Sequence, residues 1–280
     1  MYSLSGINIA PEYLEYDYKV REEINANRLF RDKRVINGKY VRRKDFSYVV
    51  RIESLKRNQV DAFFFGSSGT SYCSGSIISP KWILTAAHCL DKLKDFIDSH
   101  FHIRTMLDDI QKYFVYPHYH RGLLENDVAL IKLKQPITIG SYYQTSIVKL
   151  PPSNTNSWPE EGTICSVSGY GCEKVKGPVS ELLKTLRVPI MKKRSCQMSF
   201  GLNVRINLTD SKEFCAGFFM KNQSICQGDS GGPLTCLLNG EDVIAGIVSA
   251  THKYYPESYP GIFSRVTYFL SWIRYLMETE

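Results

Sequence analysis

Three short motifs bring together the residue types that acyl transfer to a hydroxyl requires. Ser230 lies within residues 226–233, CQGDSGGP, whose glycines leave the main chain open to a substrate carbonyl. The backbone N–H groups of Gly228 and Ser230 are candidates for binding the oxyanion of a tetrahedral intermediate. A serine hydroxyl is a weak nucleophile unless a base lies beside it. His88 in TAAHC and Asp127 in NDVAL supply a base and a carboxylate to orient that base.

In the order His88, Asp127, Ser230, these motifs resemble those of the trypsin-like serine proteases, the chymotrypsin-fold family. The resemblance covers residues 34 to 275. It implies that His88 is general base and then general acid, that Asp127 is the buried partner of the imidazole, and that Ser230 is the nucleophile. Each motif alone is more often a loop or a turn, but three in the family's order, with matching cysteines, form a strong signal.

The size and composition of the chain fit this interpretation. A length of 280 residues is ample for a sizeable core. Eight cysteines, an even number without Cys-x-x-Cys zinc spacing, indicate an oxidising compartment. The net charge is +7, but the sequence contains no nucleic-acid-binding motif and no apolar run long enough to span a membrane. The resemblance implies protein or peptide substrates and protein inhibitors as partners, and we expect a monomer without nucleic acid, membrane or cofactor.

The expected fold class is all-β, with two packed six-stranded antiparallel β-barrels and a C-terminal α-helix. Short segments of strand-forming residues between turn signals indicate the barrels. The connection between them is rich in Pro, Ser, Asn and Thr, and apolar residues near the C-terminus recur at helical spacing. The predicted division is a pro-segment over 1–34 and a peptidase domain over 35–280, with an N-terminal barrel over 35–136, a C-terminal barrel over 163–266 and a helix over 267–277.

Ten segments give the clearest strand signals. The apolar run at residues 63–65, FFF, is interpreted as part of a further strand, with an exposed contact surface as the alternative. The ten segments are 49–52, 73–78, 82–85 and 128–133 in the first barrel, and 163–168, 182–190, 213–217, 232–238, 243–249 and 261–266 in the second.

The junction between RDKR and VING at Arg34 and Val35 resembles the family's activation site. Cleavage after Arg34 would free the α-amino group of Val35, and the resemblance implies that this ammonium pairs with Asp229. A buried carboxylate without a partner is costly, so we expect the uncut chain to be nearly inactive. The RDKR pattern fits a furin-like convertase and a trypsin-like protease equally well as the activating enzyme.

The cysteines follow the family with one departure. The usual partner of Cys226 lies in the loop after Ser249, where this chain has Tyr254. One extra cysteine, Cys172, follows SGYG, so we expect a shifted bridge from Cys172 to Cys226, with two free thiols as the alternative. The resemblance implies three further disulfides, namely Cys73 to Cys89, Cys165 to Cys236, and Cys196 to Cys215.

The resemblance also implies which residues form the primary substrate pocket. Its base is Ser224, six residues before the nucleophile, so no carboxylate is available to hold a buried Arg or Lys. Thr251 narrows the neck where the family often has glycine, whereas Gly261 leaves the rear open. Ile225 beside the base favours an apolar P1 side chain. The backbone of Ser249 to Thr251 is expected to pair with an extended substrate. We expect uncharged P1 residues of small to medium size, with aromatic residues as the runner-up.

Other features carry less chemistry. Two His-x-His pairs are interpreted as surface residues, and residues 102–116 leave little room for the family's calcium loop, so we expect no bound metal. Asn207 and Asn222 begin N-x-S/T patterns, which are typical of a glycoprotein. Ser74 stands where the family usually has glycine.

The favoured function is a secreted serine endopeptidase made as a zymogen, which hydrolyses peptide bonds through an acyl-enzyme. Its rival is a catalytically silent homologue that binds a protein partner through the same surface, and the altered pocket keeps this alternative open. An esterase shares the chemistry, but the nucleophile motif is not G-x-S-x-G. Residues 1–11 lack the charged and apolar regions of a signal peptide. The cysteine pattern and the activation site nevertheless favour an extracellular location.

Overall fold

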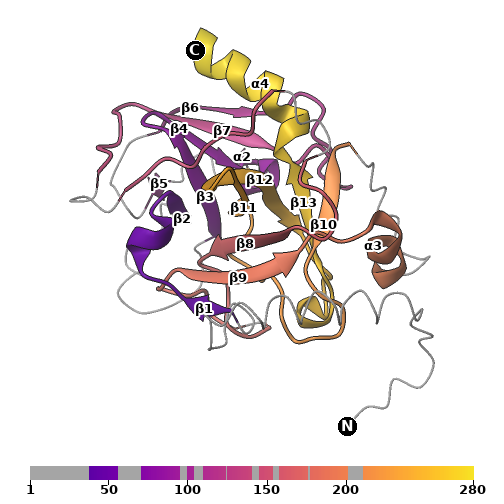
Figure 1. Ribbon diagram of the computed structural model, residues 1–280. Coiled ribbons are helices and arrows are strands. Elements are labelled where there is room, and N and C mark those ends of the chain that lie inside the picture. Colours follow the sequence, from indigo (N-terminus) through magenta and orange to yellow (C-terminus); the bar gives the residue numbers. More distant parts are fainter. Residues whose placement is uncertain are drawn as a thin grey trace. The chain divides into compact units, whose positions relative to one another are not determined.

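Strands dominate the structure, which is a computed structural model of the chain (Figure 1). The activation junction at Arg34 and Val35, the FFF run and Asn207 lie outside the residues that the structure describes. The described residues are 38–55, 71–94, 100–103, 110–123, 125–140, 145–153, 158–175, 177–200 and 211–280.

One antiparallel sheet contains six strands in the order β5-β2-β3-β4-β7-β6. Its central strands carry apolar side chains on both faces, and Ile83, Leu84, Leu130 and Ile131 are fully buried. β-Branched and leucine side chains of this kind favour a buried strand. The strands are β2 (Val49–Leu55), β3 (Ser71–Ser79), β4 (Trp82–Thr85), β5 (His100–Ile103), β6 (Ile110–Val115) and β7 (Ala129–Leu133).

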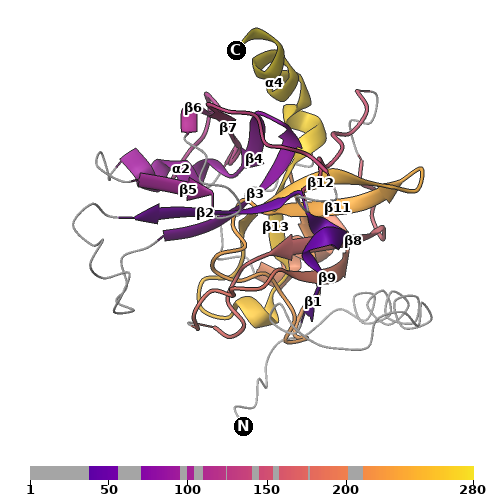
Figure 2. The same cartoon turned by 90° about the vertical axis from the view of Figure 1, so that its left-hand side faces the viewer.

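The second sheet contains seven strands in the order β1-β9-β8-β11-β12-β13-β10. Figure 2 shows this sheet beside the six-stranded one. Its strands are β1 (Lys39–Tyr40), β8 (Ile164–Gly169), β9 (Lys184–Pro189), β10 (Glu213–Ala216), β11 (Pro233–Leu238), β12 (Glu241–Ala250) and β13 (Gly261–Arg265).

The C-terminal helix α4 packs against β12 of the seven-stranded sheet and also reaches β6 and Tyr116 of the other sheet's side. Its buried face includes Phe269 and Ile273, and the ring of Tyr116 lies edge-on to both Phe269 and Trp272, with centroids 4.9 and 5.3 Å away. At its end Glu280 forms an ion pair with Lys112 of β6. The helical segments are α2 (Ala87–Lys94), α3 (Lys193–Phe200) and α4 (Val266–Thr279), with 3-10 turns η1 (Arg43–Phe46) and η4 (Pro256–Ser258).

These sheets and the final helix confirm the predicted fold class. The second sheet has one more strand than expected, because the two-residue β1 pairs with β9 at its edge, joining Lys39 to Thr185. No helix within the described residues is both long and apolar enough to cross a membrane.

Candidate active site

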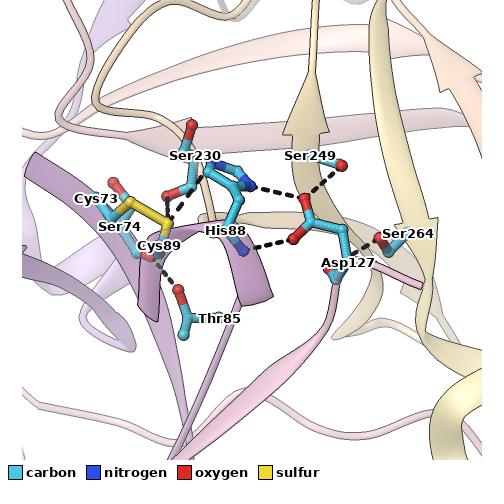
Figure 3. A network of polar contacts seen from close by, with 9 residues as sticks. All are labelled: Cys73, Ser74, Thr85, His88, Cys89, Asp127, Ser230, Ser249 and Ser264. Atoms are coloured by element: carbon cyan, nitrogen blue, oxygen red, sulfur yellow. Dashed lines mark hydrogen bonds and ion pairs between the residues drawn. A yellow bond between two sulfur atoms is a disulfide. The ribbon is translucent and has the colours of Figure 1, made fainter. Parts of the chain in front are cut away.

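The predicted catalytic residues come together where elements of the two sheets meet (Figure 3). His88 lies in the first turn of α2, just after β4 ends at Thr85. Asp127 precedes β7, whose Ala129 pairs with Thr85, so the strand register brings the carboxylate beside the histidine. Ser230 lies in the loop before β11 of the other sheet.

Asp127 is fully buried and organises the histidine through two contacts. Its Oδ1 accepts a hydrogen bond from the His88 backbone N–H at 2.8 Å, and its Oδ2 lies 2.7 Å from His88 Nδ1. Ser249 Oγ donates to the same Oδ2 at 2.6 Å, and Ser264 Oγ donates to the Asp127 carbonyl at 3.0 Å. The carboxylate is therefore fixed by several donors and favours the tautomer that carries a proton on Nδ1.

Ser230 lies beside the His88 ring (Figure 3). No hydrogen bond joins these two side chains in the described part of the chain. His88 Nε2 instead lies 3.8 Å from the Sγ of Cys89, and that sulfur is 3.6 Å from the Ser230 carbonyl. A disulfide sulfur has no proton to donate, so this second contact is one of packing. Hydrogen bonds of catalytic residues are often incomplete before substrate binds.

Ser74 has a role that the sequence analysis missed. Its backbone N–H donates to the Ser230 carbonyl at 2.7 Å, and its Oγ donates to the Gly228 carbonyl at 2.9 Å. Thr85 Oγ1 in turn donates to the Ser74 carbonyl at 2.9 Å. A glycine at position 74 would leave the Gly228 carbonyl without this hydroxyl, so Ser74 ties the nucleophile loop to β3.

The two glycines after the nucleophile allow close packing of the loop against neighbouring segments. The expected role was to open the backbone to substrate. A Cβ at Gly231, whose φ is +79°, would overlap Thr85 Oγ1 and the Ser74 carbonyl. A Cβ at Gly232 would lie 2.8 Å from the Ser168 carbonyl. These positions allow the loop to pass between the two sheets.

The backbone N–H groups of Gly228 and Ser230 donate to no protein group among the described residues. Gly228 has a φ of +99°, a conformation that side chains strongly disfavour. The intervening Asp229 N–H closes a turn by donating to the Cys226 carbonyl at 3.0 Å. The arrangement leaves two donors of one loop available for an oxyanion.

Asp229 of the same loop is buried. Its carboxylate accepts hydrogen bonds from the N–H groups of Gly171 at 2.7 Å and Cys226 at 2.8 Å. A Cβ at Gly169 or Gly171 would overlap this carboxylate, so the SGYG sequence makes room for it. Burial raises the pKa of Asp229 to about 6, although the two backbone donors and the charge of Lys184 lower it.

Lys184 is the cation that acts on Asp229. Its side chain is 1% exposed and its Nζ lies 2.7 Å from Glu173 Oε1. The same Nζ lies 5.0 Å from the centre of the Tyr40 ring, and the Tyr40 hydroxyl donates to Glu173 Oε1 at 2.5 Å. Sequence reasoning missed Lys184, because only the pairing of Lys184 with Gly169 between β9 and β8 brings it near Asp229.

The structure joins all eight cysteines in disulfides. The bridge from Cys172 to Cys226 links the loop after β8 to the loop that contains the nucleophile, and the Cys172 N–H donates to the Gln227 carbonyl at 2.9 Å. The other disulfides join Cys73 to Cys89, Cys165 to Cys236, and Cys196 to Cys215.

The predicted pocket residues also gather near the nucleophile loop. Ser224 is buried and its hydroxyl donates to the Tyr259 carbonyl at 2.8 Å. Thr251 Oγ1 lies 3.4 Å from the Pro260 carbonyl across the neck. A Cβ at Gly261 would lie 2.9 Å from Ile225 Cδ1, so Ile225 packs against this position. The structure thus brings Ser224 and Ile225 together with the residues that flank Gly261.

Among the described residues, one cluster has the spacing of a metal site, and it consists of Cys73, His88 and Cys89. Both cysteines belong to a disulfide, so they offer no thiolate for a metal. Asn222 is exposed, while Ser224 of the same N-x-S pattern is buried.

Comparison with known proteins agrees with this geometry. A family model described as Trypsin matches residues 36–273. The chain is 36% identical over 214 residues to Trypsin-4 of Rattus norvegicus, covering 74% of this chain and 81% of that protein. It is 32% identical over 258 residues to Trypsin-3 of Salmo salar, covering 89% and 95%, and 34% identical over 229 residues to a Tryptase of Mus musculus, covering 75% and 80%. The chain belongs to the Trypsin family and is a serine endopeptidase.

Proposed function

We propose that this endopeptidase uses Ser230 as nucleophile, His88 as general base and then acid, and Asp127 as the residue that orients His88. The observation that supports this assignment best is the 2.7 Å contact between His88 Nδ1 and Asp127 Oδ2, beside Ser230. With the proton held on Nδ1, the lone pair of Nε2 is available to take the proton of the Ser230 hydroxyl.

The reaction proceeds in two stages. Ser230 Oγ attacks the carbonyl carbon of the scissile bond while His88 Nε2 takes its proton, and the buried Asp127 stabilises the resulting imidazolium. The N–H groups of Gly228 and Ser230 bind the oxyanion. His88 then protonates the leaving amine, which yields an acyl-enzyme. Water, activated by the same histidine, hydrolyses this ester and restores Ser230.

The enzyme is made as a zymogen with a pro-segment over 1–34 and a peptidase domain over 35–280. Cleavage after Arg34 by a trypsin-like or furin-like protease frees the Val35 ammonium, which pairs with Asp229. The burial of Asp229 and its raised pKa support this step, because such a carboxylate gains most from a new cation. The four disulfides support an extracellular location.

The pocket favours uncharged P1 residues of small to medium size. Ser224 is neutral and already engaged by the Tyr259 carbonyl, so a substrate Arg or Lys finds no carboxylate at the base. The contact of Thr251 with the Pro260 carbonyl supports a narrow neck, which favours these residues over aromatic ones as the runner-up.

The test is a peptide library that varies P1, supplied to the chain after cleavage at Arg34. We expect hydrolysis after Ala, Val, Leu or Met, and none by the Ser230→Ala variant. Turnover that survives in Ser230→Ala would refute the assigned nucleophile, and cleavage mainly after Arg or Lys would refute the pocket. Binding of protein partners without any turnover would favour the catalytically silent alternative.

A further inference from the structure

The segment from Ala250, the last residue of β12, to Pro260 leads into β13 and forms one wall of the proposed pocket. It follows Ser249, carries Thr251 at the neck and ends just before Gly261. It contains no cysteine, and Cys226 is joined to Cys172 on the other side of the nucleophile loop. Noncovalent contacts must therefore hold this wall in place.

His252 lies at the centre of those contacts. Its Nδ1 accepts the backbone N–H of Tyr254 at 3.3 Å and that of Tyr255 at 3.1 Å. Because both partners are donors, Nδ1 carries no proton in this arrangement and the imidazole is neutral, with its hydrogen on Nε2. A protonated ring would direct an N–H at two other N–H groups and would lose both bonds.

The imidazole also stacks on two tyrosine rings. Its centroid lies 4.1 Å from that of Tyr259 at an interplanar angle of 14°, and 5.6 Å from that of Tyr255 at 22°. Phe200 and Phe219 also pack on the Tyr259 ring, each with a centroid separation of 5.4 Å. The stack thus connects the loop to α3 and to the segment before the pocket base.

Tyr259 links this stack to the pocket itself. Its carbonyl accepts the hydroxyl of Ser224 at the base, at 2.8 Å. The next residue, Pro260, accepts the hydroxyl of Thr251 at the neck. Both pocket hydroxyls therefore donate to backbone carbonyls of Tyr259, on whose ring the imidazole stacks, and of the residue next to it.

We propose that His252 is a positioning residue for substrate specificity: its neutral imidazole holds the 250–260 wall in place of a disulfide, and its protonation weakens substrate binding. The inference rests on the proposed function, because it concerns the pocket of that enzyme. His252 touches no reacting atom and acts through Tyr259 and Ser224.

The charged groups around His252 set the pH range of this effect. Burial lowers the pKa of His252 below its ordinary value of 6.5, while the carboxylate of Glu257 in η4 opposes this shift. Tyr254, Tyr255 and Tyr259 also face the ring, and Lys253 Nζ lies 5.3 Å from the Tyr254 ring. Because the pKa of His252 is lowered, Nδ1 accepts both hydrogen bonds above pH 6.5, and these bonds are lost as the pH falls below that value.

The experiment compares two variants in the chain cut at Arg34. His252→Asn offers an Oδ1 to the N–H groups two and three residues later, as in an Asx-turn, but does not ionise. His252→Phe keeps a ring for stacking and removes the acceptor. His120→Asn is the control, since His120 is exposed and pairs with Glu125 in an isolated β-bridge away from the 250–260 segment.

We compare the KM of the wild-type enzyme with that of His252→Asn at each pH. As the pH is lowered from about 7.5 to about 5.5, this KM ratio should rise about threefold to tenfold, which is the change expected from one net hydrogen bond. The kcat ratio should stay level, because both enzymes share His88 and the loop binds ground state and transition state alike. His252→Phe should show the raised KM at both pH values, and His120→Asn should follow the wild type.

In an enzyme that turns over peptides, the ratio of the wild-type KM to that of each variant could be the same at both pH values. This result would overturn the role of His252 and leave the proposed function standing. A correctly cut chain that neither cleaves peptides nor reacts with a fluorophosphonate at Ser230 would instead overturn the proposed function, and this inference with it.

Discussion

Replacement of Asp229 by Asn in the uncut chain should change how stability depends on pH. The carboxylate has a pKa of about 6 in the folded chain and 3.8 as its ordinary value. The folded state therefore holds a proton that the unfolded state has released between these pH values. The stabilisation is present below pH 3.8 and is lost as the pH rises past about 6.

The magnitude follows from the size of the shift. Each pKa unit corresponds to about 1.4 kcal/mol, so the ionised Asp229 costs the uncut chain about 3 kcal/mol at neutral pH. Asn keeps one acceptor for the N–H groups of Gly171 and Cys226 and loses the other, which costs about 1–3 kcal/mol at every pH. The variant should thus be less stable than wild type near pH 4. Between pH 4 and pH 7 its free energy of unfolding should rise by about 3 kcal/mol relative to that of wild type.

The assay is guanidinium unfolding across that pH range, with Arg34→Ala added to both proteins so that neither is cut. Asp45→Asn is a matched control, because the Asp45 side chain is 40% exposed and pairs with Arg42 on the surface. A stability difference between wild type and Asp229→Asn that does not change with pH would refute the reasoning. In the cut enzyme, pairing with Val35 should remove or reverse this dependence.

Two further changes probe the pocket and its support. Thr251→Gly removes the side chain at the neck and should raise kcat/KM for Phe relative to Ala at P1 by about tenfold, whereas Thr251→Ser should keep the wild-type preference, as a P1 library will measure. A non-reducing peptide map should recover Cys172 and Cys226 in one linked peptide pair, and alkylation of either residue would contradict the bridge.

The strand segments and the catalytic motifs were readable from the sequence because they depend on local patterns. The predicted strand at 82–85 matches β4, and the predicted helix at 267–277 lies within α4, Val266–Thr279. The shorter helix α3, Lys193–Phe200, was not predicted. It buries only Cys196, Ser199 and Phe200, which is too short a repeat to establish helical periodicity.

The site features that sequence reasoning missed all depend on contacts between distant segments. Ser74 reaches the Gly228 carbonyl across 154 positions of the chain. Lys184 influences Asp229 only through the pairing of β8 with β9. The loop after Ser249 was recognised by its missing cysteine, but the stacking of His252 on Tyr259 has no local signature.

The central claim is that Ser230 is an activated nucleophile after cleavage at Arg34. Its most direct test is covalent labelling with a fluorophosphonate, before and after that cleavage, with Ser230→Ala as the control. The account predicts labelling of Ser230 in the cut chain, little in the uncut chain and none in the variant. A folded, correctly cut chain that remains unlabelled would contradict it.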